Sequence, residues 1–193
     1  FKKNDQLKDL DSAGSNEILK QIINKNYLLK KFYIECYNLF RQELIIENRL
    51  ESKILEIGSG AGFIKDIIPN TITSEIVELK DIDHKMDATK LELLDNNIDA
   101  ILLLNVLHHI SNPEKFIFEC QRVLKKNGII LMIEPANTWL SRIIYKNFHH
   151  EDFDEFSDWY LKEGGRLSAS NQAIPYIIFE RDIKKFKKKF PNL

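Results

Sequence analysis

Three glycines at alternate positions follow a short apolar run and form the stretch best suited to bind a ligand. Gly58, Gly60 and Gly62 come directly after ILEI, which contains Glu56. Glycine permits positive φ angles and lets the main chain approach a ligand closely. The dinucleotide fingerprint G-x-G-x-x-G binds a pyrophosphate, whereas here the spacing is G-x-G-x-G and a carboxylate beside the turn would repel a diphosphate. The stretch favours a cationic or neutral nucleoside ligand, with a glycine turn in an unrelated fold as the alternative.

Histidines in two places could move a proton near neutral pH. His108 and His109 follow a long apolar run, whereas His149 and His150 stand in an acidic, aromatic segment together with Asp152, a further candidate base. A histidine at the start of a helix often packs rather than reacts, and we favour that role for His108. His109 and His149 are therefore the predicted general bases.

The composition is that of an ordinary globular protein. The chain has 193 residues, of which 44% are hydrophobic and 30% charged, and this length is typical of one domain with a sizeable core. A formal net charge of −1 argues against a general nucleic-acid binder. The sequence contains no run of about 18 apolar residues and no N-terminal signal segment. We expect a cytoplasmic protein that does not enter a membrane.

The two cysteines, Cys36 and Cys120, lie far apart in helical patterns. Neither has neighbours at the spacing of metal ligands, and free buried thiols are favoured over a disulfide. The sequence therefore predicts no metal site.

Hydrophobic periodicity divides the chain into helices and strands. Helical spacing recurs over 16–47, 112–126 and 181–190, and a short helix fits 63–68. Short apolar or β-branched runs predict strands at 53–57, 71–76, 97–105 and 129–134, with a weaker one at 82–86. Alternating strands and helices predict βαβ units, and so a doubly wound, Rossmann-like, mostly parallel α/β sheet. After the fifth strand, residues 137–163 are predicted to be helical and to form a lid over the carboxyl ends of the strands.

Four segments fall at strand ends on one side of this sheet: ILEIGSGAGF, TITSE, MDAT and NIDAILLLNVLHHI. In this order they resemble the class I S-adenosylmethionine-dependent methyltransferases, in particular the group with a type 11 methyltransferase domain. RVLKKNGIILMIEP is similar to that group's segment before the fifth strand. The resemblance covers roughly residues 33–135. It implies a single domain with N-terminal helices (1–50), a cofactor-binding core (51–135) and an acceptor or lid region (136–193).

The resemblance also implies which residues contact the cofactor. Gly58, Ser59, Gly60 and Gly62 would face its methionine and ribose parts, and Glu56 would lie near its ammonium or sulfonium charge. The other contacts that it implies are made by Glu75, Asp87, Ala88 and Asn105. Glu75 would accept from the ribose hydroxyls, Asp87 with Ala88 would meet the adenine, and Asn105 would approach the methionine end.

The assignment of the ribose ligand has rivals. Glu75 lies 17 residues after Gly58 (75 − 58), close to the ~20-residue spacing of the ribose-binding acid in dinucleotide folds. Glu78 and Asp81 also follow the second predicted strand, and we place Glu75 first. The sequence departs from the family here, because the second crossover helix is expected to be lost. Strands six and seven of the family are not visible either.

We expect an enzyme that transfers a methyl group from S-adenosylmethionine, leaving S-adenosylhomocysteine, to a small-molecule or saccharide-like acceptor. The segment His149–Tyr160 is acidic and aromatic, and it suits a polar, hydroxyl-bearing molecule better than a phosphate backbone. One alternative is an RNA or protein methyltransferase that uses the lysine-rich tail, although nucleic acid is the less favoured partner. Another is a catalytically inactive module that binds S-adenosylmethionine.

Overall fold

The computed structural model describes residues 13–148, 151–161, 169–191 and 193, and it confirms the predicted fold class. Five strands of this described part pair in parallel in the order β3-β2-β1-β4-β5. They are β1 (Ile54–Ile57), β2 (Ile72–Glu75), β3 (His84–Lys85), β4 (Ile98–Leu104) and β5 (Leu124–Ile133). The order reverses between β1 and β4, and ligands of such sheets bind beyond the carboxyl ends of the strands at this reversal.

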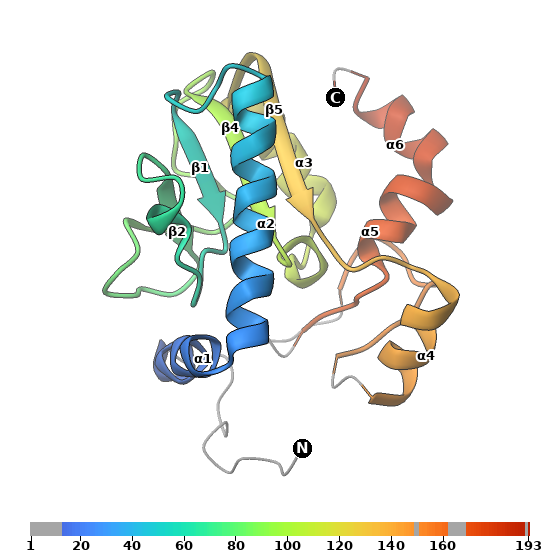
Figure 1. Cartoon of the computed structure of the whole chain (residues 1–193). Helices are drawn as coiled ribbons and strands as arrows, with labels where there is room; N and C mark the ends of the chain where they lie inside the picture. The colour runs from blue at the N-terminus through green and yellow to red at the C-terminus, as the bar shows by residue number, and fades with distance from the viewer. Residues whose placement is uncertain (1–12, 149–150, 162–168, 192) are drawn as a thin grey trace.

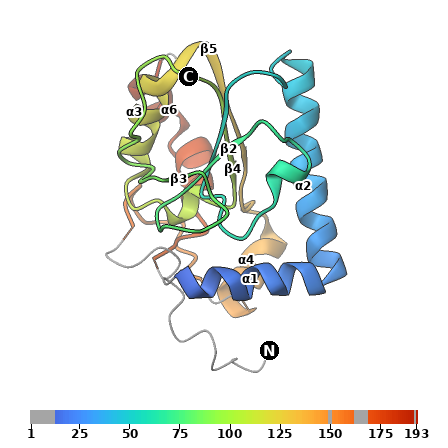
Figure 2. The same ribbon diagram turned by 90° about the vertical axis from the view of Figure 1, so that its left-hand side faces the viewer.

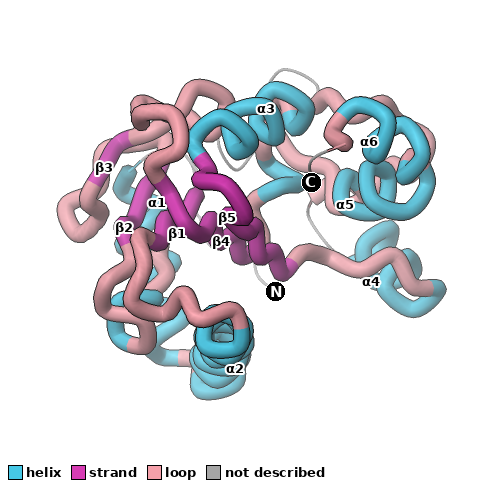
Figure 3. The backbone as a smooth tube through the Cα atoms, turned by 90° about the horizontal axis from the view of Figure 1, so that it is seen from above, coloured by secondary structure: helices cyan, strands magenta, loops and turns pink. Residues whose placement is uncertain are grey.

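Helices cover both faces of the sheet (Figures 1 and 3). One face carries α2 (Tyr27–Ile46), and the other carries α3 (Pro113–Val123), α5 (Ile174–Tyr176), a π-helical turn η4 (Ile177–Arg181) and α6 (Ile183–Lys189). Figure 2 shows α1 (Ala13–Lys25) lying across the end of the sheet to which the strands point. The predicted helical region 16–47 therefore forms two helices in different positions: α2 packs on the sheet, and α1 borders the carboxyl ends of the strands.

Two apolar clusters hold these layers together, one on each face of the sheet. Alternate residues of a strand point to opposite faces, so Leu102 and Leu104 of β4 pack with α2, while Ile101 and Leu103 pack with α3 and the C-terminal helices. Every residue of β4 except Asp99 is buried, as expected for a strand covered on both faces. The sheet is thus a rigid support for whatever extends from its carboxyl ends.

The start of α3 was predicted correctly, but its end was not. Asn112 caps the helix, since its side chain accepts a hydrogen bond from Lys115 N at 2.9 Å, and proline follows at the first position. The helix was expected to reach Lys126, yet it ends at Val123. Leu124 is extended (φ −69°, ψ 136°), is buried in the core and pairs with Ile98 as the first residue of β5. The exposed polar residues 125–127 then loop out as a bulge, because they have no apolar face to hold another helical turn.

Three further elements are shorter than predicted. The helix expected at 63–68 is a single 3-10 turn, η2 (Ile64–Asp66), and the strand expected at 82–86 is the two-residue β3. The helix expected over 137–163 is α4 (Trp139–Phe148), and residues 151–161 are not helical. In that stretch Asp154 accepts from Phe156 N at 3.0 Å, a local turn that competes with the helical hydrogen-bond pattern. As predicted, no helix joins β2 to β3.

Both cysteines are free and buried, as predicted. The lysine-rich helix α6 is amphipathic, with Phe186 against the core and its lysines facing outward. Among the described residues, no helix has both the length and the apolar character needed to cross a membrane.

Candidate active site

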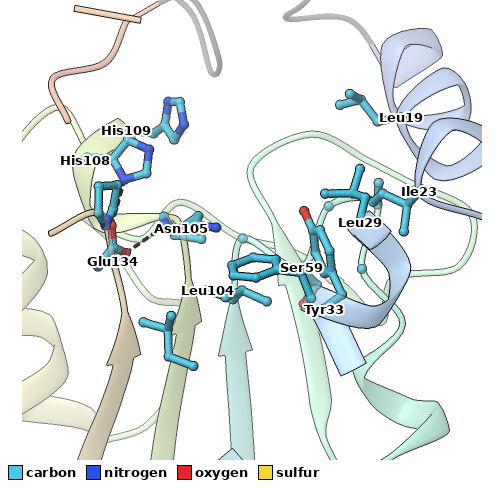
Figure 4. Close-up of a pocket in the computed structure, with 18 of the residues that line it drawn as sticks. Leu19, Ile23, Leu29, Tyr33, Ser59, Leu104, Asn105, His108, His109 and Glu134 are labelled. Atoms are coloured by element: carbon cyan, nitrogen blue, oxygen red, sulfur yellow. Dashed lines mark hydrogen bonds and ion pairs between the residues drawn. The ribbon is translucent and has the colours of Figure 1, made fainter. Parts of the chain in front are cut away.

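A cavity of about 650 Å³ opens at the carboxyl ends of β1, β4 and β5. Its wall on one side is made by the glycine loop with α1 and α2, and on the other side by the chain after β4 and β5 (Figure 4). We call the first side the glycine-loop end (Glu56 with Gly58–Gly62) and the second the histidine end (His108, His109, Glu134 and Glu151). Asn105 lies between them.

The glycine loop needs its glycines for two different reasons. Gly58 and Gly60 have positive φ angles of 67° and 44°, which other residues adopt only with strain. Gly62 has an ordinary φ, but an added β-carbon would lie 2.1 Å from the Tyr37 hydroxyl oxygen. Ser59 N donates to Ser74 O at 2.9 Å and ties the loop to β2. The loop is therefore fixed in a bare, concave shape against the cavity.

Glu56 is a buried acid at this end, with 2% of its surface exposed. Burial raises the pKa of its carboxyl to about 7, although hydrogen bonds from Ser59 and Tyr37 act in the opposite direction. Its Oε2 atom has no hydrogen-bond partner among the described residues. Buried polar atoms without partners are rare in folded proteins. A cationic group in the cavity would stabilise this carboxylate, so the glycine-loop end is chemically suited to an ammonium or sulfonium.

Two other buried polar atoms of the cavity wall also lack partners within the described chain: Oδ1 of Asn16 and Nδ1 of His109. Asn16 donates from Nδ2 to Gly60 O at 3.2 Å and so holds α1 beside the glycine loop. Sequence reasoning missed Asn16, since a single asparagine in a helix carries no signal of its own. Together with Glu56, these atoms indicate that the cavity binds a polar ligand.

The three candidate ribose ligands lie in different places. Glu75 is buried and lines both the main cavity and a smaller one of about 160 Å³ beside it. Its Oε1 accepts from Ile76 N at 2.8 Å. Glu78 is exposed, and Asp81 is an exposed partner of Lys20 at 2.6 Å. Of the three acids, Glu75 is the one that borders the cavities.

The remaining predicted contacts surround the same space. Asp87 and Ala88 line the smaller cavity next to Glu75. Asp87 also accepts from the backbone and hydroxyl of Thr89, which orients its carboxylate. Asn105 has a φ of 55° at the end of β4 and donates from its backbone to Ile133 O at 2.8 Å. The structure thus brings the sequence-predicted cofactor residues together around two adjoining cavities.

The histidine end is a network of four charged or polar side chains. Nδ1 of His108 lies 2.7 Å from Oε2 of Glu134, whose Oε1 accepts from the backbone N–H groups of Val106 and Leu107. Nε2 of His108 is 3.5 Å from Glu151 Oε2, and Nε2 of His109 is 3.6 Å from Glu151 Oε1. Three separate segments of the chain therefore meet at one point.

The surroundings of the two histidines shift their pKa values in opposite directions. Burial acts to lower the pKa of His108, but its hydrogen bonds to Glu134 and Glu151 outweigh burial and raise that pKa. The pKa of His109 is lowered by burial and by the neighbouring His108. His109 is thus held as a neutral imidazole, whereas His108 is held between two carboxylates.

Sequence reasoning had assigned His108 to packing and had not singled out Glu134. Glu134 directly follows β5 and precedes Pro135, and an acid at the carboxyl end of a strand in such a sheet is a candidate site residue that the sequence could have indicated. Gln172, which donates to Glu151, gave no such signal. The other predicted base, His149, and its neighbour His150 lie outside the described residues.

Two tyrosines of α2, Tyr33 and Tyr37, lie beside the glycine loop in different roles. Tyr37 is 1% exposed and directs its hydroxyl toward Gly62, which makes it part of the core that supports the loop. Tyr33 is half-buried and lines the cavity.

Comparison with known proteins gives a family for part of the chain. Residues 55–132 match the family described as Methyltransferase domain, Methyltransf_11. A Bacillus subtilis (strain 168) protein named "Uncharacterized methyltransferase YcgJ" is 28% identical over 168 residues, which cover 76% of this chain and 66% of that protein. A Mycolicibacterium smegmatis protein named "Probable S-adenosylmethionine-dependent methyltransferase" is 26% identical over 117 residues, covering 50% of this chain and 45% of that protein. The chain thus spans less than two thirds of the length of either relative.

Among solved structures, a Thermotoga maritima S-adenosylmethionine-dependent methyltransferase, described as a possible histamine N-methyltransferase, aligns with a TM-score of 0.47 and 20% identity. The alignment covers 82% of this chain and 79% of that one. The resemblance seen in the sequence is confirmed by the family match: residues 55–132 are a class I S-adenosylmethionine-dependent methyltransferase domain. The cofactor of this class is S-adenosylmethionine.

Proposed function

We propose that the protein transfers a methyl group from S-adenosylmethionine to a small, polar acceptor that binds at the histidine end of the cavity. The observation that carries the cofactor's placement is the unpartnered Oε2 of Glu56, buried beside a loop with two positive-φ glycines. The cofactor bears an ammonium and a sulfonium, so it offers the cations that this carboxylate is suited to meet. When bound, it supplies an electrophilic methyl group.

The chain's own residues have the chemistry to hold such a cofactor. Gly58 and Gly60 let the backbone approach it, and Glu75 offers carboxylate oxygens at the edge of both cavities. Asp87 and Ala88 line the smaller cavity, whose size suits a flat base. Asn105 stands between the glycine-loop end and the histidine end of the main cavity. The protein's task is to orient the acceptor, exclude water and accept a proton where the acceptor carries one.

The size and polarity of the cavity support a small acceptor. Ligand sites of roughly 300–1,000 Å³ hold one drug-sized molecule, and the cavity of about 650 Å³ has to accommodate the cofactor as well. Its far wall is polar, with His109, Glu151, Gln172 and Tyr145. A hydroxyl- or amine-bearing molecule, such as a saccharide-like acceptor, matches these groups. We also propose that residues 136–193 bind the acceptor or act as a lid, and that the protein is cytoplasmic.

The RNA or protein methyltransferase remains the weaker alternative. This alternative depends on the lysines of α6. That helix lies toward the opposite end of the sheet from α1, which borders the cavity (Figure 1). Lys189 is paired with Glu114 at 2.5 Å, and Lys185 lies over the Trp159 ring. These lysines do not border the cavity.

Calorimetric titration of the full chain with S-adenosylhomocysteine tests the cofactor site. We expect saturable binding that Glu56→Gln weakens and that Glu78→Gln, a matched change at an exposed acid, leaves unchanged. Release of S-adenosylhomocysteine from S-adenosylmethionine is then measured with small amines, phenols, hydroxy acids and saccharides, and with RNA and protein. Turnover of RNA or protein alone would support the alternative. Cofactor binding without turnover on any class would indicate an inactive module, and no binding would overturn the proposal.

A further inference from the structure

Three side chains of the histidine end form a grouping whose chemistry goes beyond that of a proton acceptor. His108, His109 and Glu151 each offer one ligand atom, and these atoms all lie within 4.8 Å of one another. His108 Nε2 lies 3.5 Å from Oε2 of Glu151, and His109 Nε2 lies 3.6 Å from the other carboxylate oxygen, Oε1. Two imidazoles and a carboxylate thus converge on one point of the cavity wall.

These distances are close to those of a metal centre. Zinc binds histidine nitrogen and carboxylate oxygen at about 2.0–2.2 Å, and a tetrahedral arrangement of such bonds sets the ligand atoms roughly 3.3–3.5 Å apart. Each histidine nitrogen already lies at about such a separation from one oxygen of Glu151, 3.5 Å for His108 and 3.6 Å for His109. Side-chain rotation has to bring the three ligand atoms, which lie within 4.8 Å of one another, to the same spacing, so the cluster is partly preformed.

The groups behind the cluster match those that support metal-binding histidines. A histidine ligand usually binds the ion with one ring nitrogen and donates from the other to a carboxylate, which fixes the tautomer and the ring orientation. His108 meets this requirement, because its Nδ1 lies 2.7 Å from Glu134 Oε2 while its Nε2 points toward Glu151. Two backbone N–H groups fix Glu134 in turn, and Gln172 donates to Glu151.

We propose that His108, His109 and Glu151 bind a divalent transition-metal ion of the zinc type at the histidine end of the cavity, with Glu134 as a positioning residue. Imidazole ligands suit zinc and its neighbours, whereas magnesium prefers oxygen ligands. This departs from the expectation of no metal site drawn from the sequence. Glu151 lies 42 residues after His109 (151 − 109), so no short spacing could reveal the set of ligands.

The inference rests on the proposed function and narrows the chemical class of the acceptor. Three protein ligands leave a coordination position open, as in catalytic zinc sites. An acceptor hydroxyl bound there would lose its proton to water and keep the electron pair on oxygen, since a metal ion lowers the pKa of a coordinated hydroxyl. The ion would then take over the role expected of a bare histidine base. The favoured acceptors carry a hydroxyl next to a second oxygen or nitrogen that can share the ion.

The test uses the untagged, metal-free full chain, titrated with Zn²⁺ by calorimetry and with Co²⁺ by visible absorption. We expect one Zn²⁺ per chain and no comparable binding of Mg²⁺. His109→Ala and Glu151→Gln should each weaken Zn²⁺ binding at least tenfold, and Glu134→Gln should weaken it by about 10-fold to 100-fold. The matched control is His84→Ala, because His84 is an exposed histidine of β3 and should not alter binding.

Parallel titration of each variant with S-adenosylhomocysteine shows whether the cavity is still folded, and it separates the two proposals. Absence of saturable Zn²⁺ binding in a chain that binds S-adenosylhomocysteine would overturn the metal site and leave the methyltransferase assignment in place. Zn²⁺ binding that survives both His109→Ala and Glu151→Gln would equally overturn it. Zn²⁺ binding without S-adenosylhomocysteine binding would instead count against the proposed function.

Discussion

The two ends of the cavity are built on different principles. At the glycine-loop end one short, continuous segment sets the shape through its backbone, and Glu56 keeps a buried oxygen without a partner. At the histidine end His108, Glu134 and Glu151 come from three separate segments and already contact one another. The first end is thus arranged to meet a ligand's charge, and the second is arranged by its own contacts. Substitutions should therefore affect binding at one end and turnover at the other.

The largest effect is expected from Gly60→Val at the glycine-loop end. Gly60 has a φ of 44°, and an added β-carbon would lie 3.4 Å from Glu75 Oε2, so the branched side chain brings both backbone strain and a filled cavity wall. We expect affinity for S-adenosylhomocysteine to fall by about 100-fold or more, which corresponds to ~3 kcal/mol. Calorimetry measures the loss, and circular dichroism checks that the sheet remains folded. An unchanged affinity would remove the loop from the binding site.

At the histidine end, His109→Ala should lower turnover on the true acceptor by about 100-fold, because it removes the group that accepts or orders the leaving proton. Affinity for S-adenosylhomocysteine should change much less than turnover, since His109 lies across the main cavity from the glycine loop and only borders the smaller cavity proposed for the base. Steady-state kinetics and calorimetry on the same preparation give both numbers. Full turnover with reduced thermal stability would make His109 a packing residue and leave His149 as the candidate to test.

A smaller effect is expected from Glu75→Gln, which keeps the shape of the side chain and removes its charge. Charge-assisted hydrogen bonds contribute roughly 1.5–3 kcal/mol, so affinity for S-adenosylhomocysteine should fall about tenfold. The paired variant Glu78→Gln changes an exposed acid and should bind normally. The reverse outcome, with Glu78 sensitive and Glu75 not, would show that the ribose ligand had been misassigned.

A pH-dependent effect is expected from Glu56. Burial raises its pKa from 4.5 to about 7 in the ligand-free protein, so the folded state holds this proton more tightly than the unfolded chain does. The stability that it contributes is complete below about pH 4.5 and is lost as the pH rises to about 7. At pH 8, Glu56→Gln should therefore unfold with a free energy higher by on the order of 3 kcal/mol.

The same proton links pH to cofactor affinity. Only the ionised carboxylate attracts a cation, so affinity for S-adenosylmethionine should fall several-fold between pH 7 and pH 6. Glu56→Gln should abolish that dependence. Denaturant unfolding of the wild type and of Glu56→Gln at pH 8 tests the prediction on stability. Titration of both proteins with S-adenosylmethionine at pH 6 and pH 7 tests the prediction on affinity. A variant that is less stable than the wild type at pH 8 would contradict the burial argument.

The sequence was informative where one segment determines its own structure. The apolar run of β4, the cap at Asn112 and the glycine turn all depend on local spacing, and each was located from residue types alone. The end of α3 was missed because Asn127-Gly128 looks like a helix stop, although burial of Leu124 ends the helix earlier. Local propensity did not reveal that tertiary contact.

The candidate site divides in the same way. The acids and glycines predicted to contact the cofactor sit within or directly after strands, so their meeting at one edge follows from the topology. Glu134 also follows a strand directly, but the approach of Glu151 and Gln172 to the histidines depends on how the segments after β5 fold back, and no spacing in the sequence encodes that distance. Residues 151–161 show the reason, because the Asn171 side chain accepts from the backbone N–H of Asp154 and donates to its backbone C=O, and such bonds replace the helix that the composition suggested.

The short strand β3 has a consequence for how the molecule meets its neighbours. A long, flat sheet edge exposes unpaired backbone groups onto which a strand from another molecule can add. Here the edge beyond β2 is two residues long, and both His84 and Lys85 are exposed and polar. The lost crossover helix removes cover from this side of the sheet, yet the edge left uncovered is too short and too polar to template strand addition. The shortness and polarity of β3 thus oppose edge-to-edge aggregation on this side of the sheet, whereas the other edge strand of the described sheet, β5, is ten residues long.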